Sequence, residues 1–541
     1  MNNMPQLDNF VHSVRTSMTD TNSPNMSANP RLIVNLHWMR RLIASDKALW
    51  FGAAATLFLF YYSIILISPR ALLEDPDTLW HIRTGEWILS HTQVPTVDLY
   101  SYTALGQRWI STEWLSEVLY ALAYRIGEWR GVVILSAISC AAIVAIICFH
   151  LVANLRFSLA IAWTALTALV ISHHFLARPH IFSYIILLIF FIKLLEGYDH
   201  GNFRSRVPVL CVLMILWANL HPSFTFGLAL LYVFAGYSFC EDFARRDYKR
   251  CRDALFAVIA VSVCGLITPY GVFSALLTFD TMNMRFATQN ITEWHSPDFQ
   301  QARIELFFIV VCLMTITGLG IRLRGPRLIV YGMLLILSLS YTRGLAIFFL
   351  LMPIILAQPI AKWAAWCRAA RHRRVQSFQT EYMAKAVSSL DPVLVYLQKR
   401  VIVIVAICFA GAAIQTAFSW HRIDAGPPES VAPKAAIDYV RKARITGNVF
   451  NNYNFGGYLI FKGIPTFVDG RVPPYTDEFL REYFDAVTLA DIKGAFNLLD
   501  QYKVNWVLLL PTDPLTKALA ESHQWTRVYS DKYSAVLVRS P

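Results

Sequence analysis

Apolar runs that approach the length of a membrane span recur along most of this chain of 541 residues. Hydrophobic residues make up 56% of the sequence and charged residues 16%, whereas average soluble domains contain about 25% charged residues. The runs therefore predict a polytopic α-helical membrane protein and disfavour a large soluble protein with buried helices. About eleven spans are predicted: 48–68, 131–151, 157–177, 181–198, 207–220, 223–240, 254–268, 304–320, 328–341, 344–360 and 401–419.

Two further segments border these runs without being spans. Segment 111–129 carries Glu113 and Glu117 among apolar residues at helical spacing, which indicates an amphipathic helix lying at the membrane surface. Residues 1–47 are polar and lack an apolar core, so they are not a signal peptide. We expect them to form a cytoplasmic tail that is disordered from residue 1 to about residue 35.

The distribution of Lys and Arg predicts which side of the membrane each loop occupies. With the N-terminus in the cytoplasm, the inner segments hold 25 of the 48 basic residues, the outer loops hold nine, and the chain beyond residue 420 holds the other 14. This excess of positive charge in the inner loops supports the orientation. It also accounts for most of the net charge of +12, and no basic-aromatic pattern typical of a nucleic-acid partner is present in the sequence.

The composition changes after Trp420 to that of a soluble domain. Helical patterns at 434–443, 476–487 and 489–502 alternate with predicted strands NVF, TFVD, VNWVLLLP and SAVLVRS, which predicts a small α/β domain over 421–541. In this orientation the domain is extracytoplasmic, as is the first loop, 69–130. The nine cysteines all lie outside that loop and that domain, which excludes a disulfide framework on the outer face.

Short polar motifs gather on the outer side in this topology. They are EDPDTLWH (74–81), ARPH (177–180), NLHPSF (219–224), TPYG (268–271), EWHSPD (293–298) and YTRG (341–344). The inner loops, by contrast, have the composition of ordinary basic connectors. Polar residues collected at one mouth of a helical membrane protein indicate a functional site there.

Asp75 and Asp77 flank Pro76 on a predicted turn directly after the first span. Three interpretations remain open for this pair. The acids cap a helix that begins near Thr78, they share a hard divalent cation such as Mg²⁺ or Mn²⁺, or one of them removes a proton from an acceptor hydroxyl. The last two are compatible, and no cofactor other than such a cation is suggested.

Other outer residues are candidates for binding the substrate. Trp80 can stack on a sugar ring. Arg83, Arg178 or Arg343 can bind a phosphate. An Arg near the end of a span often only extends its charged group to the lipid headgroups, so this alternative stays open. The remaining candidates are weaker alone, because turn chemistry or helix-end packing explains them as well. These are His81, Glu113, His180, His221 and Glu293 in the membrane domain, and Asn452, Tyr453, Asp469 and Arg471 in the motifs NNYNFGGY and VDGR of the tail.

An acidic element in the first outer loop, directly after the first span, resembles the GT-C superfamily of polytopic glycosyltransferases. More narrowly, DPDTLWHIRTGEWIL in the first loop, with NNYNFGGYLI and VDGR in the tail, resembles a poorly characterised group of bacterial membrane proteins over nearly the whole chain. The superfamily resemblance implies ten to thirteen helices and an extracytoplasmic C-terminal domain. This chain departs from the superfamily pattern in the later loops, where Glu293 and Asp298 are the only acidic candidates to complete a metal shell. A metal-independent mechanism therefore stays equally open.

The resemblance implies a function at the bilayer surface. A polyprenyl-phosphate-linked sugar would enter from the membrane and be transferred to a glycan, lipid or protein acceptor, with Asp75 or Asp77 as base or metal ligand and Arg343 or Arg178 beside the phosphate. The expected location is the inner membrane of a bacterium, among membrane lipids. The alternatives are a transporter or flippase for lipid-linked glycans, although no internal repeat typical of transporters is apparent, and a non-enzymatic protein of envelope assembly.

Overall fold

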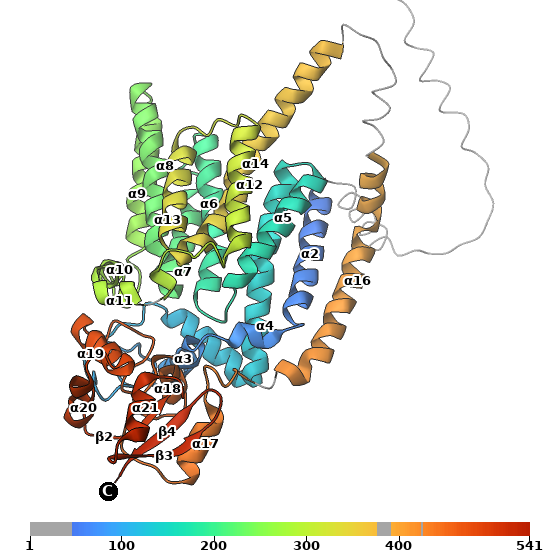
Figure 1. Cartoon of the computed structure of the whole chain (residues 1–541). Coiled ribbons are helices and arrows are strands. Elements are labelled where there is room, and N and C mark those ends of the chain that lie inside the picture. Colours follow the sequence, from blue (N-terminus) through green and yellow to red (C-terminus); the bar gives the residue numbers. More distant parts are fainter. Residues whose placement is uncertain (1–45, 291, 376–390, 424–425, 541) are drawn as a thin grey trace, which may run out of the picture.

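The computed structural model describes residues 46–290, 292–375, 391–423 and 426–540 (Figure 1). Helices lie at each of the predicted span positions. They are α2 (Asp46–Ile65), α4 (Trp114–Asn154), α5 (Phe157–Ile171), α6 (His180–Asp199), α7 (Val207–Leu220), α8 (Phe224–Ala244), α9 (Tyr248–Cys264), α12 (Arg303–Gly318), α13 (Pro326–Ser340), α14 (Thr342–Val375) and α16 (Asp391–Ile423). The disorder predicted for residues 1 to about 35 lies outside the described residues.

Seven of the described helices are long and apolar enough to cross a membrane: α2, α4, α5 with its short extension to His174, α6, α8, α14 and α16. Two shorter apolar helices, α7 and α13, accompany them. The protein is therefore a multi-pass membrane protein, while the predicted count of eleven spans is not confirmed. Helix α9 illustrates the difficulty, because its first turns carry Lys249, Arg250 and Arg252.

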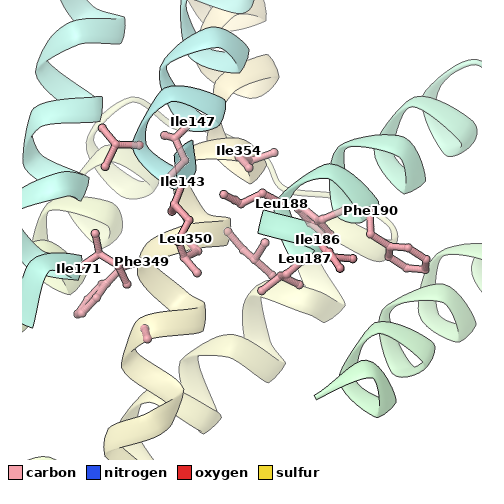
Figure 2. Close-up of a cluster of buried hydrophobic side chains, with 14 of the residues drawn as sticks. Ile143, Ile147, Ile171, Ile186, Leu187, Leu188, Phe190, Phe349, Leu350 and Ile354 are labelled. Carbon is pink, nitrogen blue, oxygen red and sulfur yellow. The ribbon is translucent and has the colours of Figure 1, made fainter. Parts of the chain in front are cut away.

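Large aliphatic and aromatic side chains from four helices fill the centre of the bundle (Figure 2). The labelled residues are Ile143 and Ile147 of α4, Ile171 of α5, Ile186, Leu187, Leu188 and Phe190 of α6, and Phe349, Leu350 and Ile354 of α14. Helix α14 is the central element, since 78% of its apolar window is buried, against 11% for α16 at the edge. The core therefore fixes α4, α6 and α14, and these helices carry the ends at which the polar motifs lie.

Prolines mark the helix starts on the side of the bundle where the motifs gather. Pro76 precedes α3 (Asp77–His91), and Pro179 precedes α6. A proline at this point costs no helical hydrogen bond and has the backbone angle of a helix already. The chain therefore enters each helix sharply, and the residues beside these prolines lie at the mouth of the bundle.

The first loop packs against the bundle through buried residues such as Leu72, Ile82 and Tyr120. It contains η1 (Pro69–Leu73), α3 and the first part of α4, which is interrupted by non-helical backbone at Gly127 and Glu128. The predicted surface helix thus forms one arm of α4, and the span forms the other. The arms meet closely, since a Cβ on Gly131 would lie 1.9 Å from the carbonyl oxygen of Ala123.

The C-terminal domain is built on a four-stranded sheet of order β1-β2-β4-β3, in which β1 and β2 are parallel and the other pairs are antiparallel. Its strands are β1 (Asn448–Asn451), β2 (Val504–Leu509), β3 (Trp525–Ser530) and β4 (Ala535–Arg539). Its helices are α17 (Lys434–Lys442), η4 (Tyr453–Phe455), α18 (Gly456–Phe461), α19 (Asp477–Thr488), α20 (Ile492–Gln501) and α21 (Pro514–Glu521). The remaining short helices, η2 (Ser172–His174), α10 (Phe273–Asn283), α11 (Arg285–Asn290) and η3 (Thr292–Trp294), connect spans of the bundle.

One predicted strand of this domain is wrong. The segment TFVD does not join the sheet; Thr466 instead forms a bridge with Ser101 of the first loop. The backbone N–H of Tyr102 donates to the carbonyl of Thr466 at 3.1 Å, and the hydroxyl of Thr103 donates to the carbonyl of Phe467 at 2.6 Å. The first loop therefore lies between the bundle and the C-terminal domain and packs against both (Figure 1).

Candidate functional site

Three carboxylates converge on the guanidinium of Arg178, which lies in the turn between η2 and α6. Its Nη1 is 3.1 Å from Asp75 Oδ2 and 2.6 Å from Glu293 Oε1, and its Nη2 is 2.5 Å from Asp77 Oδ2. Arg343, at the start of α14, binds the other oxygen of Glu293 through Nε at 2.5 Å. Four polar motifs far apart in the sequence thus form one continuous ionic cluster, as the topology predicts.

Local backbone structure orients the two aspartates differently. The carboxylate of Asp75 accepts the backbone N–H of Asp77 at 2.8 Å, so Asp75 caps the start of α3 as one of the three interpretations proposed. Asp77 is the first residue of α3, and its Oδ1 accepts the indole N–H of Trp80 at 3.0 Å. Both carboxylates are thereby held toward Arg178.

The charges of this cluster are unequal. Burial raises the pKa of Asp77 to about 7, and Asp75 opposes its ionisation while Arg178 favours it. Burial likewise raises the pKa of Asp75 above its ordinary value, against the effect of Arg178. Burial would also raise the pKa of Glu293, but Arg178 and Arg343 outweigh it and lower that pKa to about 2. The cluster therefore combines a permanently ionised Glu293 with an Asp77 that exchanges a proton near neutral pH.

A second group of carboxylates is held by histidines. Nε2 of His81 lies 3.4 Å from Glu113 Oε2, and its Nδ1 lies 3.4 Å from Glu117 Oε1. His221 Nε2 lies 3.2 Å from the other oxygen of Glu113. Burial raises the pKa of Glu113 to about 7 and lowers the pKa values of His81 and His221 well below their ordinary range, so both imidazoles are neutral at pH 7.

Sequence reasoning missed Glu117 as a site residue, because it was assigned only to the amphipathic helix. Its Oε1 accepts the hydroxyl of Ser111 at 2.6 Å, and its Oε2 has no hydrogen-bond partner in the described part of the chain. The spacing to Glu113, four residues along one helical face, was the available signal.

Four tail residues were predicted to face the cavity, and the structure separates them. Asp469 and Arg471 form a buried ion pair, 2.7 Å between Oδ2 and Nη2, with 0% of either side chain exposed. Asn452 accepts the N–H of Asn454 at 3.0 Å, which is turn chemistry. Tyr453 is partly exposed and close to the cluster; burial raises its pKa well above the ordinary value, and Asp77 adds to this.

Two other predicted residues bond outside the acidic cluster, although His180 lies close enough to Arg178, Glu293 and Arg343 for their charges to affect it. Arg83 is exposed and pairs with Glu86 of its own helix at 3.1 Å. His180 bonds the carbonyl of His174 through Nε2 at 3.0 Å, so it ties the start of α6 to η2. Trp80 does lie at the site, where it packs against Trp109, and its ring lies beside that of His81 with 3.6 Å between the centroids and 36° between the ring planes.

The metal role predicted for Asp75 and Asp77 does not fit this arrangement. The guanidinium of Arg178 takes the position between the two carboxylates that a shared cation would need. Among the residues that the structure describes, no group of three or more acidic, His or Cys side chains has the geometry to hold a metal ion. No step proposed below passes through a metal.

An apolar groove of about 410 Å³ lies where the start of α4 meets the end of α7; its lining includes Trp114, the residue after Glu113 in the sequence, and Asn219, two residues before His221. Its floor is tied together by hydrogen bonds of 2.8 Å from the indole of Trp114 to Asn219 and from Asn219 to the carbonyl of Ile267. The groove is lined by Trp114, Leu115, Ile215, Leu216, Asn219, Ile267, Thr268 and Pro269.

No protein-family model matches the sequence, and no curated protein matches it. Several solved structures do. The archaeal oligosaccharyltransferase AglB of Archaeoglobus fulgidus, in complex with an inhibitory peptide and a dolichol-phosphate, is 10% identical, with 84% of this chain and 69% of that chain covered and a TM-score of 0.48. ArnT of Cupriavidus metallidurans in the apo state is 15% identical, with 89% and 98% covered and a TM-score of 0.48.

ArnT bound to undecaprenyl phosphate is 13% identical, with 92% of this chain and 100% of that chain covered and a TM-score of 0.46. At these identities and TM-scores the likeness says nothing about single residues.

Proposed function

We propose that this protein is a membrane glycosyltransferase that moves a sugar from a polyprenyl-phosphate donor to the hydroxyl of an acceptor at the extracytoplasmic face. The observation that supports it most is the convergence of two arginines and a proton-exchanging aspartate at one mouth of the bundle. Such a transfer needs positive charge beside the departing phosphate and a base beside the attacking hydroxyl.

Glu293 marks the place of the donor phosphate. It bridges Arg178 and Arg343 with its two oxygens, which is how a phosphate bridges two guanidiniums. Its side chain is 35% exposed, more than those of the other acids bound to Arg178, so it is the acid freest to leave. In the proposed complex the phosphate displaces Glu293 and binds both arginines.

Asp77 is the proposed base, and Asp75 holds it in place. Asp75 is fixed as the cap of α3, whereas Asp77 is 12% exposed and has a pKa of about 7. The acceptor hydroxyl forms a bond to the anomeric carbon while the bond to the phosphate oxygen breaks, and its proton passes to the Asp77 carboxylate. Tyr453 and Glu113 lie around this cluster and would bind acceptor or sugar hydroxyls.

The prenyl chain is proposed to lie in the apolar groove beside Glu113. Burying a chain there removes apolar surface from water and leaves the polar end at the site. The proposed orientation keeps the tail 1–47 in the cytoplasm and places the first loop and the 421–541 domain outside. In a bacterium this corresponds to the inner membrane and to an envelope acceptor.

The experiment compares cells that express wild type, Asp77→Asn or the exposed control Asp500→Asn in place of the native gene. Mass spectrometry of the envelope glycans and of the prenyl-phosphate pool is the readout. We expect Asp77→Asn to lose one glycan modification and to accumulate the unused lipid-linked sugar, while Asp500→Asn matches wild type. Full modification in the Asp77→Asn cells would refute the proposal and favour a transporter or an assembly protein.

A further inference from the structure

Two glycines of the C-terminal domain press directly on the acidic turn of the first loop. A Cβ on Gly457 would lie 2.2 Å from the carbonyl oxygen of Pro76, and a Cβ on Gly470 would lie 2.1 Å from Asp77 Oδ1. Neither distance is possible between real atoms. The turn that carries Asp77 is therefore in contact with the domain at two points where any side chain would collide.

Gly470 belongs to the VDGR turn, and a buried ionic cluster of Arg471, Asp469 and Asp98 binds this turn to the first loop. We call this cluster the clasp. Arg471 binds Asp98 of the first loop through Nη1 at 2.5 Å and Asp469 of its own turn through Nε at 2.8 Å. Its guanidinium lies 4.9 Å from the ring centre of Tyr100 and 4.7 Å from that of Trp109. The carboxylates of both acids and the arginine are fully buried.

The clasp is also tied into each partner. Oδ2 of Asp98 accepts the backbone N–H of Ser101 at 3.0 Å, and the hydroxyl of Tyr475 donates to Asp469 Oδ2 at 2.7 Å. Both carboxylates that hold Arg471 are thus themselves held by further hydrogen bonds. A buried, fully paired charge network of this kind specifies one arrangement of the two parts.

We infer that Gly470 is a positioning residue for the proposed base, Asp77. The C-terminal domain then forms one side of the site and holds Asp77 in place. Lacking a side chain, Gly470 lets the VDGR turn close against Asp77 and fix its carboxylate toward Arg178. The inference rests on the proposed function for its catalytic meaning, and on the contacts alone for its geometry. Closure at this point also excludes water from Asp77, which agrees with the burial that raises its pKa.

The test compares Gly470→Ala with Gly494→Ala in purified protein. Gly494 lies in α20 of the same domain, where a Cβ would meet only the flexible carboxylate of Asp491. A displacement of about 1 Å at a catalytic group costs about 100-fold in rate, so we expect about a 100-fold lower kcat for Gly470→Ala with an unchanged KM for the donor. The acid limb of its pH–rate profile should move to higher pH. The added methyl group either removes water from Asp77 or separates it from Arg178, and both changes raise the pKa of Asp77. Gly494→Ala should match wild type in all three.

A second readout separates failure of this inference from failure of the proposed function. The infrared band of the protonated Asp77 carboxyl, assigned with Asp77→Asn, reports the pKa of Asp77 without any turnover. If wild type transfers no sugar but Gly470→Ala shifts that band's titration, the proposed function fails and the positioning stands. If Gly470→Ala matches Gly494→Ala in rate and titration, the inference is overturned. Should Gly470→Ala fail to fold, Asp98→Asn, which weakens the clasp without adding an atom to the turn, gives the same readings.

Discussion

Replacing the proposed base by its neutral isostere should raise the stability of the fold while removing its activity. Asp77 has a pKa of about 7 in the folded protein, against 3.8 for an ordinary aspartate. The folded state therefore binds this proton more tightly than the unfolded state does. As pH rises from 3.8 to 7 the unfolded chain ionises first, so the wild type loses stability across that range and the loss is complete above pH 7.

The size of the effect follows from the two pKa values. They differ by about three pH units, and each unit corresponds to 1.36 kcal/mol, so ionisation of Asp77 lowers the free energy of unfolding by up to about 4 kcal/mol. Asp77→Asn cannot ionise and keeps an oxygen for Arg178. We expect it to be more stable than wild type by up to about 4 kcal/mol at pH 8 and by progressively less toward pH 4.

Unfolding in detergent micelles at pH 5, 6, 7 and 8 measures this difference, with Asp500→Asn as control. The Asp500 side chain is 62% exposed, so its variant should follow wild type at every pH. An advantage of Asp77→Asn that grows with pH supports the reasoning. If Asp77→Asn is less stable than wild type at pH 8, Asp77 is ionised at little cost in the folded protein and is not the poised base described above.

Other substitutions test the remaining roles. Arg178→Lys, which cannot reach three carboxylates at once, should lower kcat by about 100-fold. Glu293→Gln should bind prenyl phosphate more tightly than wild type in a direct binding assay, because it no longer competes for the arginines; weaker binding would remove Glu293 from the phosphate position. Arg471→Met leaves two buried acids unpaired and should destabilise the C-terminal domain by about 3–5 kcal/mol in thermal unfolding. Leu216→Trp, which fills the groove, should raise KM for long-chain donors and spare short-chain analogues; an equal change for both would place the lipid elsewhere.

The convergence of the site was predictable because it depends on topology. Helix ends that share one side of a membrane are brought together by the bundle, so Asp77, Arg178, Glu293 and Arg343 meet although 266 residues separate the first from the last. The short motifs beside prolines also identify the helix starts. What the motifs do not specify is which cation binds which acid, and the predicted metal position proves to be filled by Arg178.

The contacts between the first loop and the tail were not predictable. Asp98 and Arg471 are 373 residues apart, and their pairing exists only because two separately folded parts dock. The segment TFVD contains β-branched and aromatic residues that favour a strand, yet the backbone N–H and carbonyl of Thr466 pair with Tyr100 and Tyr102 of the first loop. Strand β3 was not predicted from the sequence. Most of its residues are exposed, so the segment WTRVYS lacks the apolar pattern by which a strand is recognised.

A cryo-EM map of the protein in lipid nanodiscs with bound undecaprenyl phosphate tests the central claim most directly. We predict phosphate density within hydrogen-bond distance of both Arg178 and Arg343, Glu293 turned away from them, and prenyl density along Leu216 in the groove. Phosphate density remote from Arg178, with the Glu293 bridge intact, would contradict a donor site at the acidic turn.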